Sequence, residues 1–270
     1  MTPRTYLFVP GNRPERFAKA LACGADAVVM DLEDAVAAAD KPAARHAIAQ
    51  WWAEAGQAEQ TRVLVRINDA TSLHFVDDLQ LLREVGIASV MLPKAETEGQ
   101  IGAVRDATQA TVLPLVETAR GQAACERLAA ADGVLRLVFG TLDFALDLDL
   151  DIAADNAPLA EAAARLVLAS RLSGLLPPVA GVTPQIDDGA RLLADLAWSR
   201  RRGFGAKLCI HPRQVAPVHA ALAPDAEAIA WARRVIAAES ASPGAGQIAG
   251  RMIDRPVVLQ AQRTLARAGL

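Results

Sequence analysis

The feature that most constrains the fold of this 270-residue chain is a repeated pair of segments. Each pair has a short apolar run rich in Val, Ile and Leu, then a turn, and then a longer segment with apolar residues every three or four positions. This pattern predicts a strand followed by a helix. Because the apolar runs lack clean alternation, they are typical of parallel strands covered by helices. The strand candidates are Tyr6–Val9, Ala27–Leu32, Val63–Ile67, Ser89–Leu92, Val112–Val116, Leu135–Phe139, Val179–Val182 and Lys207–Ile210.

Eight such units predict an α/β protein with a (β/α)8 TIM barrel, an architecture of about 250 residues. A doubly wound sheet is the alternative, but it normally carries a glycine fingerprint after its first strand, and the run from Val9 to Pro14 is not one. We assign residues 1–222 to the barrel and residues 223–270 to a C-terminal helical extension, with a flexible linker at 240–246. No barrel position is left for the extension, so we expect it to pack on its own barrel rim or on a neighbouring subunit.

Composition and charge exclude several classes of protein. An apolar content of 52% excludes a disordered chain, and 28 basic against 31 acidic residues make nucleic acid an unexpected partner. The three cysteines are far apart, which argues against a disulfide framework and a zinc site and favours a reducing cytoplasm. No apolar run approaches the roughly 18 to 20 residues of a membrane span, and the N-terminal run is too short for a signal peptide. We therefore expect a cytoplasmic protein without a membrane partner.

Charged and polar side chains follow six of the predicted strands. In a barrel of this type, the carboxyl ends of the strands form the functional face. Any one of these groups alone is compatible with an ion pair or a helix cap at the rim, but six at one mouth indicate a binding site. They are Asp31 with Glu33 and Asp34, Arg66 with Asp69, Lys94, Glu117, Asp143 and His211. His211 alone is more typical of a structural residue.

Glu117 and Asp143 form the clearest pair, because they follow consecutive strands and neighbouring strands lie about 4.8 Å apart. Two carboxylates at this separation repel each other unless a cation lies between them. Oxygen ligands favour a hard ion, and Mg²⁺ usually takes one or two carboxylates and keeps positions for water and substrate. We predict a Mg²⁺ site at Glu117 and Asp143; the alternative is that Glu117 caps the helix that starts at Thr118. The other acidic residues of this segment, Asp147, Asp149 and Asp151, are expected to be solvated loop carboxylates.

Basic residues complete the predicted mouth. Arg66 ends an apolar strand, so its guanidinium is expected to point into the mouth and bind a carboxylate through two N–H groups. An ion pair with Asp69 or Glu33 is the alternative. Arg13, Arg16 and Lys19 follow the first strand beside a helix N-terminus, where phosphate groups are favoured, and exposed surface charge is the alternative for all three.

Six ordered motifs that span most of the chain resemble the citrate lyase beta subunit family, which includes malyl-CoA and citramalyl-CoA lyases. They are Leu7 to Arg16, Val29 to Val36, Leu92-Pro93-Lys94, Pro114 to Thr118, Phe139 to Asp143 and Cys209 to Pro212. The resemblance implies a Mg²⁺-dependent (β/α)8 barrel that cleaves or forms a carbon–carbon bond between an acyl-CoA-type thioester and a 2-oxo acid such as oxaloacetate, glyoxylate or pyruvate. By position, Glu117 and Asp143 match the family's metal ligands, and Arg66 matches its carboxylate-binding arginine.

The C-terminal segment around Asp254 resembles the family segment whose aspartate reaches into a neighbouring subunit's site in a homotrimer. The alternative is that Asp254 caps the final helix in its own subunit. Contacts with an acyl-carrier protein remain open, because the chain is shorter than many members of the family.

The carbon–carbon cleavage that the resemblance implies forms a thioester enolate, so the site needs groups that stabilise this negative charge. Backbone N–H groups of Gly140, Thr141 and Leu142 are candidate donors, and Asp254 or Glu33 is the candidate base in the condensing direction. Three classes of function compete: a CoA-linked carbon–carbon lyase, a thioester hydrolase or free 2-oxo-acid aldolase at the same site, and a non-catalytic accessory protein.

Overall fold

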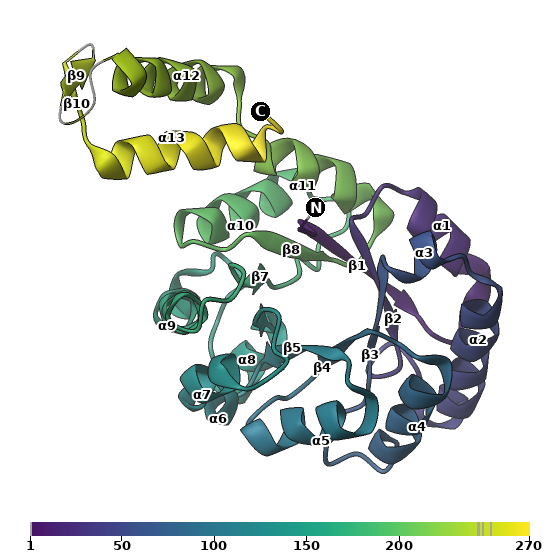
Figure 1. Cartoon of the computed structure of the whole chain (residues 1–270). Helices are drawn as coiled ribbons and strands as arrows, with labels where there is room; N and C mark the ends of the chain where they lie inside the picture. The colour runs from purple at the N-terminus through teal and green to yellow at the C-terminus, as the bar shows by residue number, and fades with distance from the viewer. Residues whose placement is uncertain (1, 242–243, 245, 249) are drawn as a thin grey trace. The chain divides into compact units, whose positions relative to one another are not determined.

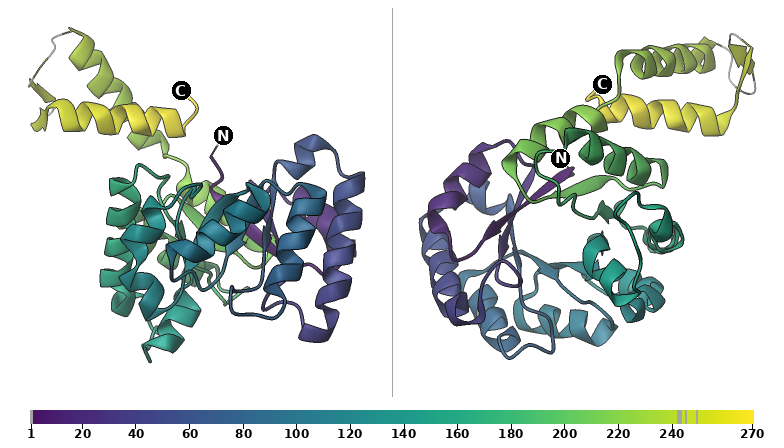
Figure 2. Two further views of the ribbon diagram at one scale, coloured as in Figure 1. Left: turned by 60° about the horizontal axis from the view of Figure 1, so that its bottom comes forward. Right: turned by 180° about the vertical axis from the view of Figure 1, so that it is seen from behind.

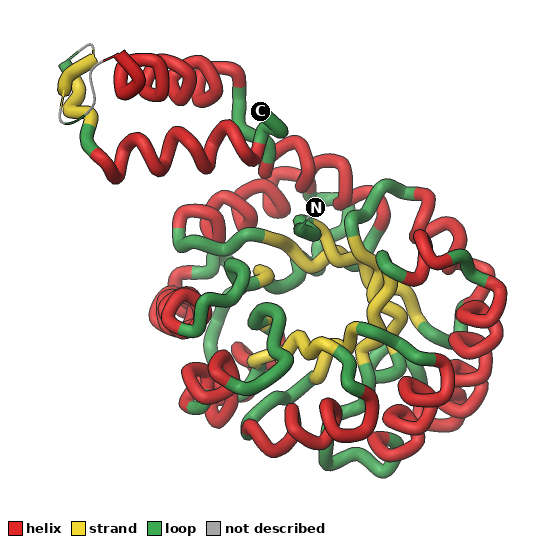
Figure 3. The backbone as a smooth tube through the Cα atoms, viewed as in Figure 1, coloured by secondary structure: helices red, strands yellow, loops and turns green. Residues whose placement is uncertain are grey.

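The computed structural model describes residues 2–241, 244, 246–248 and 250–270. Eight parallel strands form a closed barrel in the order of the sequence, as the repeated pattern predicts, and helices surround it (Figure 1). Figure 3 separates the inner ring of strands from the outer ring of helices. The strands are β1 (Thr5–Pro10), β2 (Ala27–Asp31), β3 (Val63–Arg66), β4 (Ser89–Leu92), β5 (Thr111–Val116), β6 (Val138–Phe139), β7 (Val179–Ala180) and β8 (Ala206–Cys209).

The helices between residues 17 and 222 follow the strands and enclose the barrel (Figure 2). Short 3₁₀ turns also occur, among them η1 (Pro14–Arg16) after β1 and η4 (Pro212–Gln214) after β8. The α-helices are α1 (Phe17–Ala22), α2 (Lys41–Glu54), α3 (Gln57–Gln60), α4 (Phe75–Val85), α5 (Glu98–Thr108), α6 (Ala119–Ala123), α7 (Cys125–Ala130), α8 (Thr141–Asp147), α9 (Ala160–Leu172), α10 (Gly189–Arg201) and α11 (Val215–Leu222). Among the described residues, no helix combines the length and the apolar composition needed to cross a bilayer.

Both faces of the strands are buried, which explains why the strand sequences do not alternate. Leu64 of β3 belongs to the cluster that fills the barrel interior, whereas Val65, on the opposite face, is buried outside that cluster. Arg66 is the next position after Leu64 on the inner face. Its guanidinium lies 4.8 Å above the centre of the Phe8 ring. The pleat of β3 therefore directs Arg66 toward the barrel axis.

The strand bounds differ from the sequence prediction mainly at β6 and β7, which have two residues each. Regular pairing between them is confined to Val138 and Val179. The apolar residues that precede β6 are still buried or half-buried, so hydrophobicity alone extends the predicted strand too far.

The chain divides into two compact units, one that ends at Val218 and one from His219 to Leu270. This boundary lies within α11, whereas the sequence analysis placed it after residue 222. The second unit contains α12 (Ala226–Ala241), a hairpin of β9 (Gly246–Ile248) and β10 (Arg251–Ile253), and α13 (Arg255–Arg267). Residues 242, 243 and 245 of the predicted linker lie outside the described residues. The buried core of this unit consists of Ala232, Val235, Ile253, Val258 and Ala261.

Candidate active site

Arg66 and Asp31 are paired residues at the carboxyl ends of β3 and β2. The guanidinium donates from Nε to Oδ1 of Asp31 at 2.7 Å and from Nη2 to Oδ2 at 2.6 Å. Asp31 is fully buried and also accepts the backbone N–H groups of Glu33 and Ala35. Of the two ion-pair partners named in the sequence analysis, Glu33 lies 2.8 Å from Nη1 of Arg66, whereas Asp69 accepts the N–H of Thr71. Asp31 therefore occupies one side of the Arg66 fork, and Nη1 pairs with Glu33 at 2.8 Å and Asp34 at 3.7 Å, although Oε2 of Glu33 accepts no directed hydrogen bond.

Glu33 lies between two cations. Its Oε1 accepts from Nζ of Lys94 at 2.9 Å, and its Oε2 lies 2.8 Å from Nη1 of Arg66 without a directed hydrogen bond. Burial raises the pKa of Glu33 even though both cations act to lower it. Glu33 is thus a buried carboxyl group at the mouth, and its role as a base stays a prediction.

Glu117 follows β5 directly, and only 2% of its surface is exposed. Its Oε1 accepts the backbone N–H of Lys94 at 2.7 Å. The N-cap of α6 is Thr118, whose Oγ1 accepts from the N–H of Gly121 at 3.0 Å. The alternative role proposed for Glu117, a helix cap, is therefore wrong.

The carboxyl group of Glu117 is electrostatically unfavourable in this environment. Burial, and then the negative charges of Glu33 and Asp143, raise its pKa to about 8. A Cβ added to Gly140 would lie 2.5 Å from Oε2 of Glu117, so only glycine permits this close approach. Asp143 lies in the first turn of α8. Among the described residues, no three His, Cys, Asp or Glu side chains gather as a metal cluster.

The start of α8 offers fewer backbone donors than the sequence analysis predicted. The N–H of Gly140 already donates to the carbonyl of Val116 at 3.0 Å, so the assignment of Gly140 as an oxyanion donor is wrong. Thr141 and Leu142 are the first two residues of α8, where backbone N–H groups have no partner within the helix. The oxyanion role of these two N–H groups stays a prediction.

Asp147, predicted to be a solvated loop carboxylate, has a structural contact. It is the last residue of α8 and accepts the N–H of Ala119 at 2.7 Å. Ala119 begins α6, two residues after Glu117. Asp147 therefore joins the helix that carries Asp143 to the loop that carries Glu117. A strand-by-strand sequence analysis misses this contact because it connects two separate loops.

The basic residues after β1 are exposed, and two of them have acidic neighbours. Nε of Arg13 lies 2.9 Å from Oε1 of Glu15, and Nε of Arg16 lies 3.8 Å from the same oxygen. Lys19 is an exposed residue of α1. His211 is the N-cap of η4, and its Nδ1 accepts from the N–H of Arg213 at 3.1 Å, in agreement with a structural role.

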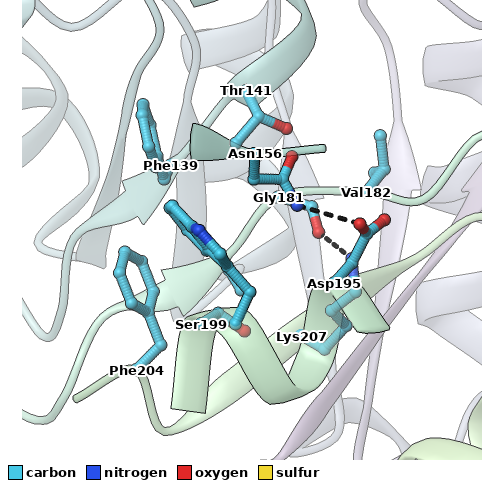
Figure 4. Close-up of a pocket in the computed structure, with 11 residues that line it drawn as sticks. Phe139, Thr141, Asn156, Gly181, Val182, Asp195, Ser199, Phe204 and Lys207 are labelled. Carbon is cyan, nitrogen blue, oxygen red and sulfur yellow. Dashed lines mark hydrogen bonds between the residues drawn. The ribbon is translucent and has the colours of Figure 1, made fainter. Parts of the chain in front are cut away.

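A second polar cluster, missed by the sequence analysis, lies beside β6, β7 and β8 (Figure 4). Lys207 is fully buried and donates to the carbonyl of Gly181, and burial lowers its pKa to about 8. Asp195 of α10 accepts from Thr183 at 2.7 Å and from Asn156 at 2.9 Å. The cavity has a free volume of about 20 Å³, enough for about one water molecule and too small for a substrate. The sequence signal that could have found this cluster is Lys207, a lysine within an apolar strand.

In the second unit, Asp254 is the N-cap of α13. Its Oδ1 accepts from the N–H of Val257 at 3.2 Å, and the side chain is half-buried. Asp254 therefore has the role named as the alternative in the sequence analysis, the cap of the final helix within its own chain.

The comparison with known proteins matches residues 4–212 to the family model described as HpcH/HpaI aldolase/citrate lyase. A citrate lyase subunit beta-like protein of Mycobacterium tuberculosis (strain ATCC 25618 / H37Rv) is 38% identical over 273 residues, covering 98% of this chain and 95% of the relative. The mitochondrial citramalyl-CoA lyase of Homo sapiens is 31% identical over 291 residues, covering 98% and 85%. A (3S)-malyl-CoA thioesterase of Cereibacter sphaeroides (strain KD131 / KCTC 12085) is 30% identical over 272 residues, covering 98% and 94%.

The structural comparison gives the same result. The crystal structure of protein CitE from Mycobacterium tuberculosis in complex with magnesium, acetoacetate and coenzyme A has a TM-score of 0.89 and 36% sequence identity, covering 99% of this chain and 98% of CitE. Family model, relatives and barrel agree: the chain belongs to the HpcH/HpaI aldolase/citrate lyase family.

Proposed function

We propose that this protein is a Mg²⁺-dependent carbon–carbon lyase that cleaves or forms a 3-hydroxyacyl-CoA thioester. The products of cleavage are an acyl-CoA and a 2-oxo acid. The observation that carries the proposal is the buried Glu117, held beside Asp143 and Arg66 at the mouth of a citrate lyase-family barrel.

The donor set fits a divalent cation. Glu117 is buried near two other carboxylates, and its raised pKa shows that the negative charge is poorly compensated. When bound, Mg²⁺ supplies Lewis acidity to the oxygen atoms of the substrate. Glu117 and Asp143 would hold it. The CitE structure in complex with magnesium supports the choice of metal.

The remaining residues recognise the substrate. The guanidinium of Arg66 binds the carboxylate of the 2-oxo acid. The N–H groups of Thr141 and Leu142 stabilise negative charge on the substrate oxygen atoms. Arg13, Arg16 and Lys19 contact the phosphates of coenzyme A, in keeping with the coenzyme A bound by CitE.

Cleavage breaks the bond between C2 and C3 of the thioester. The hydroxyl group loses its proton and becomes the 2-oxo group, and the electron pair of the broken bond forms a thioester enolate, which is then protonated. Arg66 holds the carboxylate, and Glu33 or Asp254 moves the proton. In this role, Asp254 reaches the mouth from a neighbouring subunit of a homotrimer. We assign the protein to the cytoplasm.

Thioester hydrolysis at the same site is the second candidate, favoured by the relative named (3S)-malyl-CoA thioesterase. The two functions give different products. We expect a panel of 3-hydroxyacyl-CoA thioesters, incubated with the protein and Mg²⁺, to release a 2-oxo acid from at least one member, and EDTA to stop the reaction. Release of free coenzyme A without a 2-oxo acid would instead indicate a hydrolase.

A further inference from the structure

Lys94 has a backbone conformation that is unusual for its residue type. Its φ is +45°, in the left-handed region where a side chain other than glycine carries a steric cost. Among the described residues, the only other non-glycine residues with positive φ are Gln109 and Asp149. Gln109 is the C-cap that follows α5, where this conformation is common, and Asp149 lies in the loop after α8. Lys94, by contrast, lies at the mouth, two residues after β4.

This conformation is accompanied by two contacts from one residue. The backbone N–H of Lys94 donates to Glu117, and its ammonium donates to Glu33. The two carboxylates come from the ends of β5 and β2 and are almost fully buried, whereas 41% of the Lys94 side chain is exposed. Lys94 therefore links the candidate metal ligand to the candidate base.

The type of donor at each carboxylate matters for the chemistry. A backbone N–H orients Glu117 through one oxygen without neutralising its charge, so the carboxylate still attracts a cation. An ammonium on Glu117 would compete with that cation. At Glu33 the ammonium offsets the burial of a carboxylate that needs to be ionised before it can accept a proton.

We propose that Lys94 is a positioning residue, which orients Glu117 through its backbone N–H and Glu33 through its ammonium. Its left-handed conformation allows both contacts. The proposal rests on the proposed function, since it assigns the metal to Glu117 and the proton transfer to Glu33.

Two substitutions separate the backbone contact from the charge. Lys94→Gly and Lys94→Ala both remove the ammonium, but only glycine adopts the left-handed conformation without steric cost. Calorimetry with Mg²⁺ alone should show that Lys94→Gly binds within about threefold of the wild type, and that Lys94→Ala binds about fivefold more weakly than Lys94→Gly. Gln109→Gly and Gln109→Ala are the matched pair outside the site, and both should bind Mg²⁺ as the wild type does.

Steady-state kinetics test the ammonium. Both Lys94 variants should lose about tenfold or more in kcat with little change in KM, and ethylamine should restore part of kcat to Lys94→Gly. A purely structural role predicts equal loss of folded protein and no amine rescue. If the wild type binds Mg²⁺ and is active, equal Mg²⁺ affinity of the two Lys94 variants, or an unchanged kcat in both, would overturn the role of Lys94. A wild type that binds no Mg²⁺ and cleaves no thioester would overturn the proposed function as well.

Discussion

At the scale of single residues, Glu117 combines almost complete burial with two neighbouring negative charges, those of Glu33 and Asp143. Its pKa of about 8 means that the metal-free protein holds a proton there at neutral pH. This carboxyl group takes up its proton on folding between about pH 4.5 and pH 8, so its contribution to the free energy of unfolding decreases as pH rises through that range. Mg²⁺ binding requires the carboxylate and therefore releases the proton.

The Glu117 prediction follows from this linkage. Below pH 8, Mg²⁺ affinity should increase with pH, and binding at pH 7 should release a proton that calorimetry in buffers of different ionisation enthalpy detects. Glu117→Gln should lose Mg²⁺ binding but remain folded at pH 8. A variant with unchanged metal affinity would contradict the assignment of Glu117 as a ligand.

Arg66 gives a second prediction. Arg66→Lys keeps the charge but loses the planar fork, so affinity for oxaloacetate should fall by roughly 1 to 3 kcal/mol, the range of a hydrogen bond to a charged group. Because Arg66 also neutralises buried Asp31, thermal unfolding of the variant serves as the control. Equal affinity for oxaloacetate in a stable variant would show that Arg66 binds no substrate carboxylate.

The sequence placed Arg66 at the mouth but did not identify Asp31 as its partner. Periodicity indicates which residue ends a strand, whereas the pairing of Asp31 with Arg66 depends on the register between β2 and β3. The contact between Lys94 and Glu117 is also absent from any sequence pattern, because it depends on one left-handed backbone residue. Strand ends predict where charges gather, but not which charges pair.

At the scale of elements, α8 carries the candidate ligand in its first turn and Asp147 in its last. The bond from Ala119 to Asp147 fixes this helix to the loop after Glu117. Asp147→Ala should lower the melting temperature by about 2–4 °C, as loss of a cap worth about 1 kcal/mol does in a domain of this size. It should also weaken Mg²⁺ binding a few-fold, and Asp147→Asn should restore part of that binding.

Asp149→Asn is the control for Asp147→Asn, because it removes the same charge from the same acidic run and asparagine tolerates left-handed φ. It should bind Mg²⁺ like the wild type. If both variants weaken Mg²⁺ binding equally, the loss reflects local negative charge and not the contact with Ala119.

The order and type of the barrel elements follow from hydrophobic periodicity, because each strand is buried on both faces. Their ends follow less well: β7 has two residues, and the hairpin of β9 and β10 was not predicted, since its strands have three residues each and no apolar alternation. Short strands carry too little pattern to separate them from loops.

At the scale of the whole molecule, Asp254 tests whether the site is shared between subunits. An Asp254→Ala chain and a Glu117→Gln chain should each be inactive, and activity should reappear when they are mixed and exchange subunits, because some sites then contain both intact groups. Mixtures that stay inactive after verified exchange would restrict Asp254 to its observed role as the cap of α13.

The fate of the thioester carbon skeleton separates carbon–carbon cleavage from hydrolysis. Mass spectrometry of a cleaved 3-hydroxyacyl-CoA should show one acyl-CoA and one 2-oxo acid for each thioester consumed, with no cleavage by the Glu117→Gln or Asp143→Asn protein or in EDTA. An intact hydroxy acid with free coenzyme A, or cleavage at the same rate in the two variants, would contradict a metal-dependent carbon–carbon lyase at this mouth.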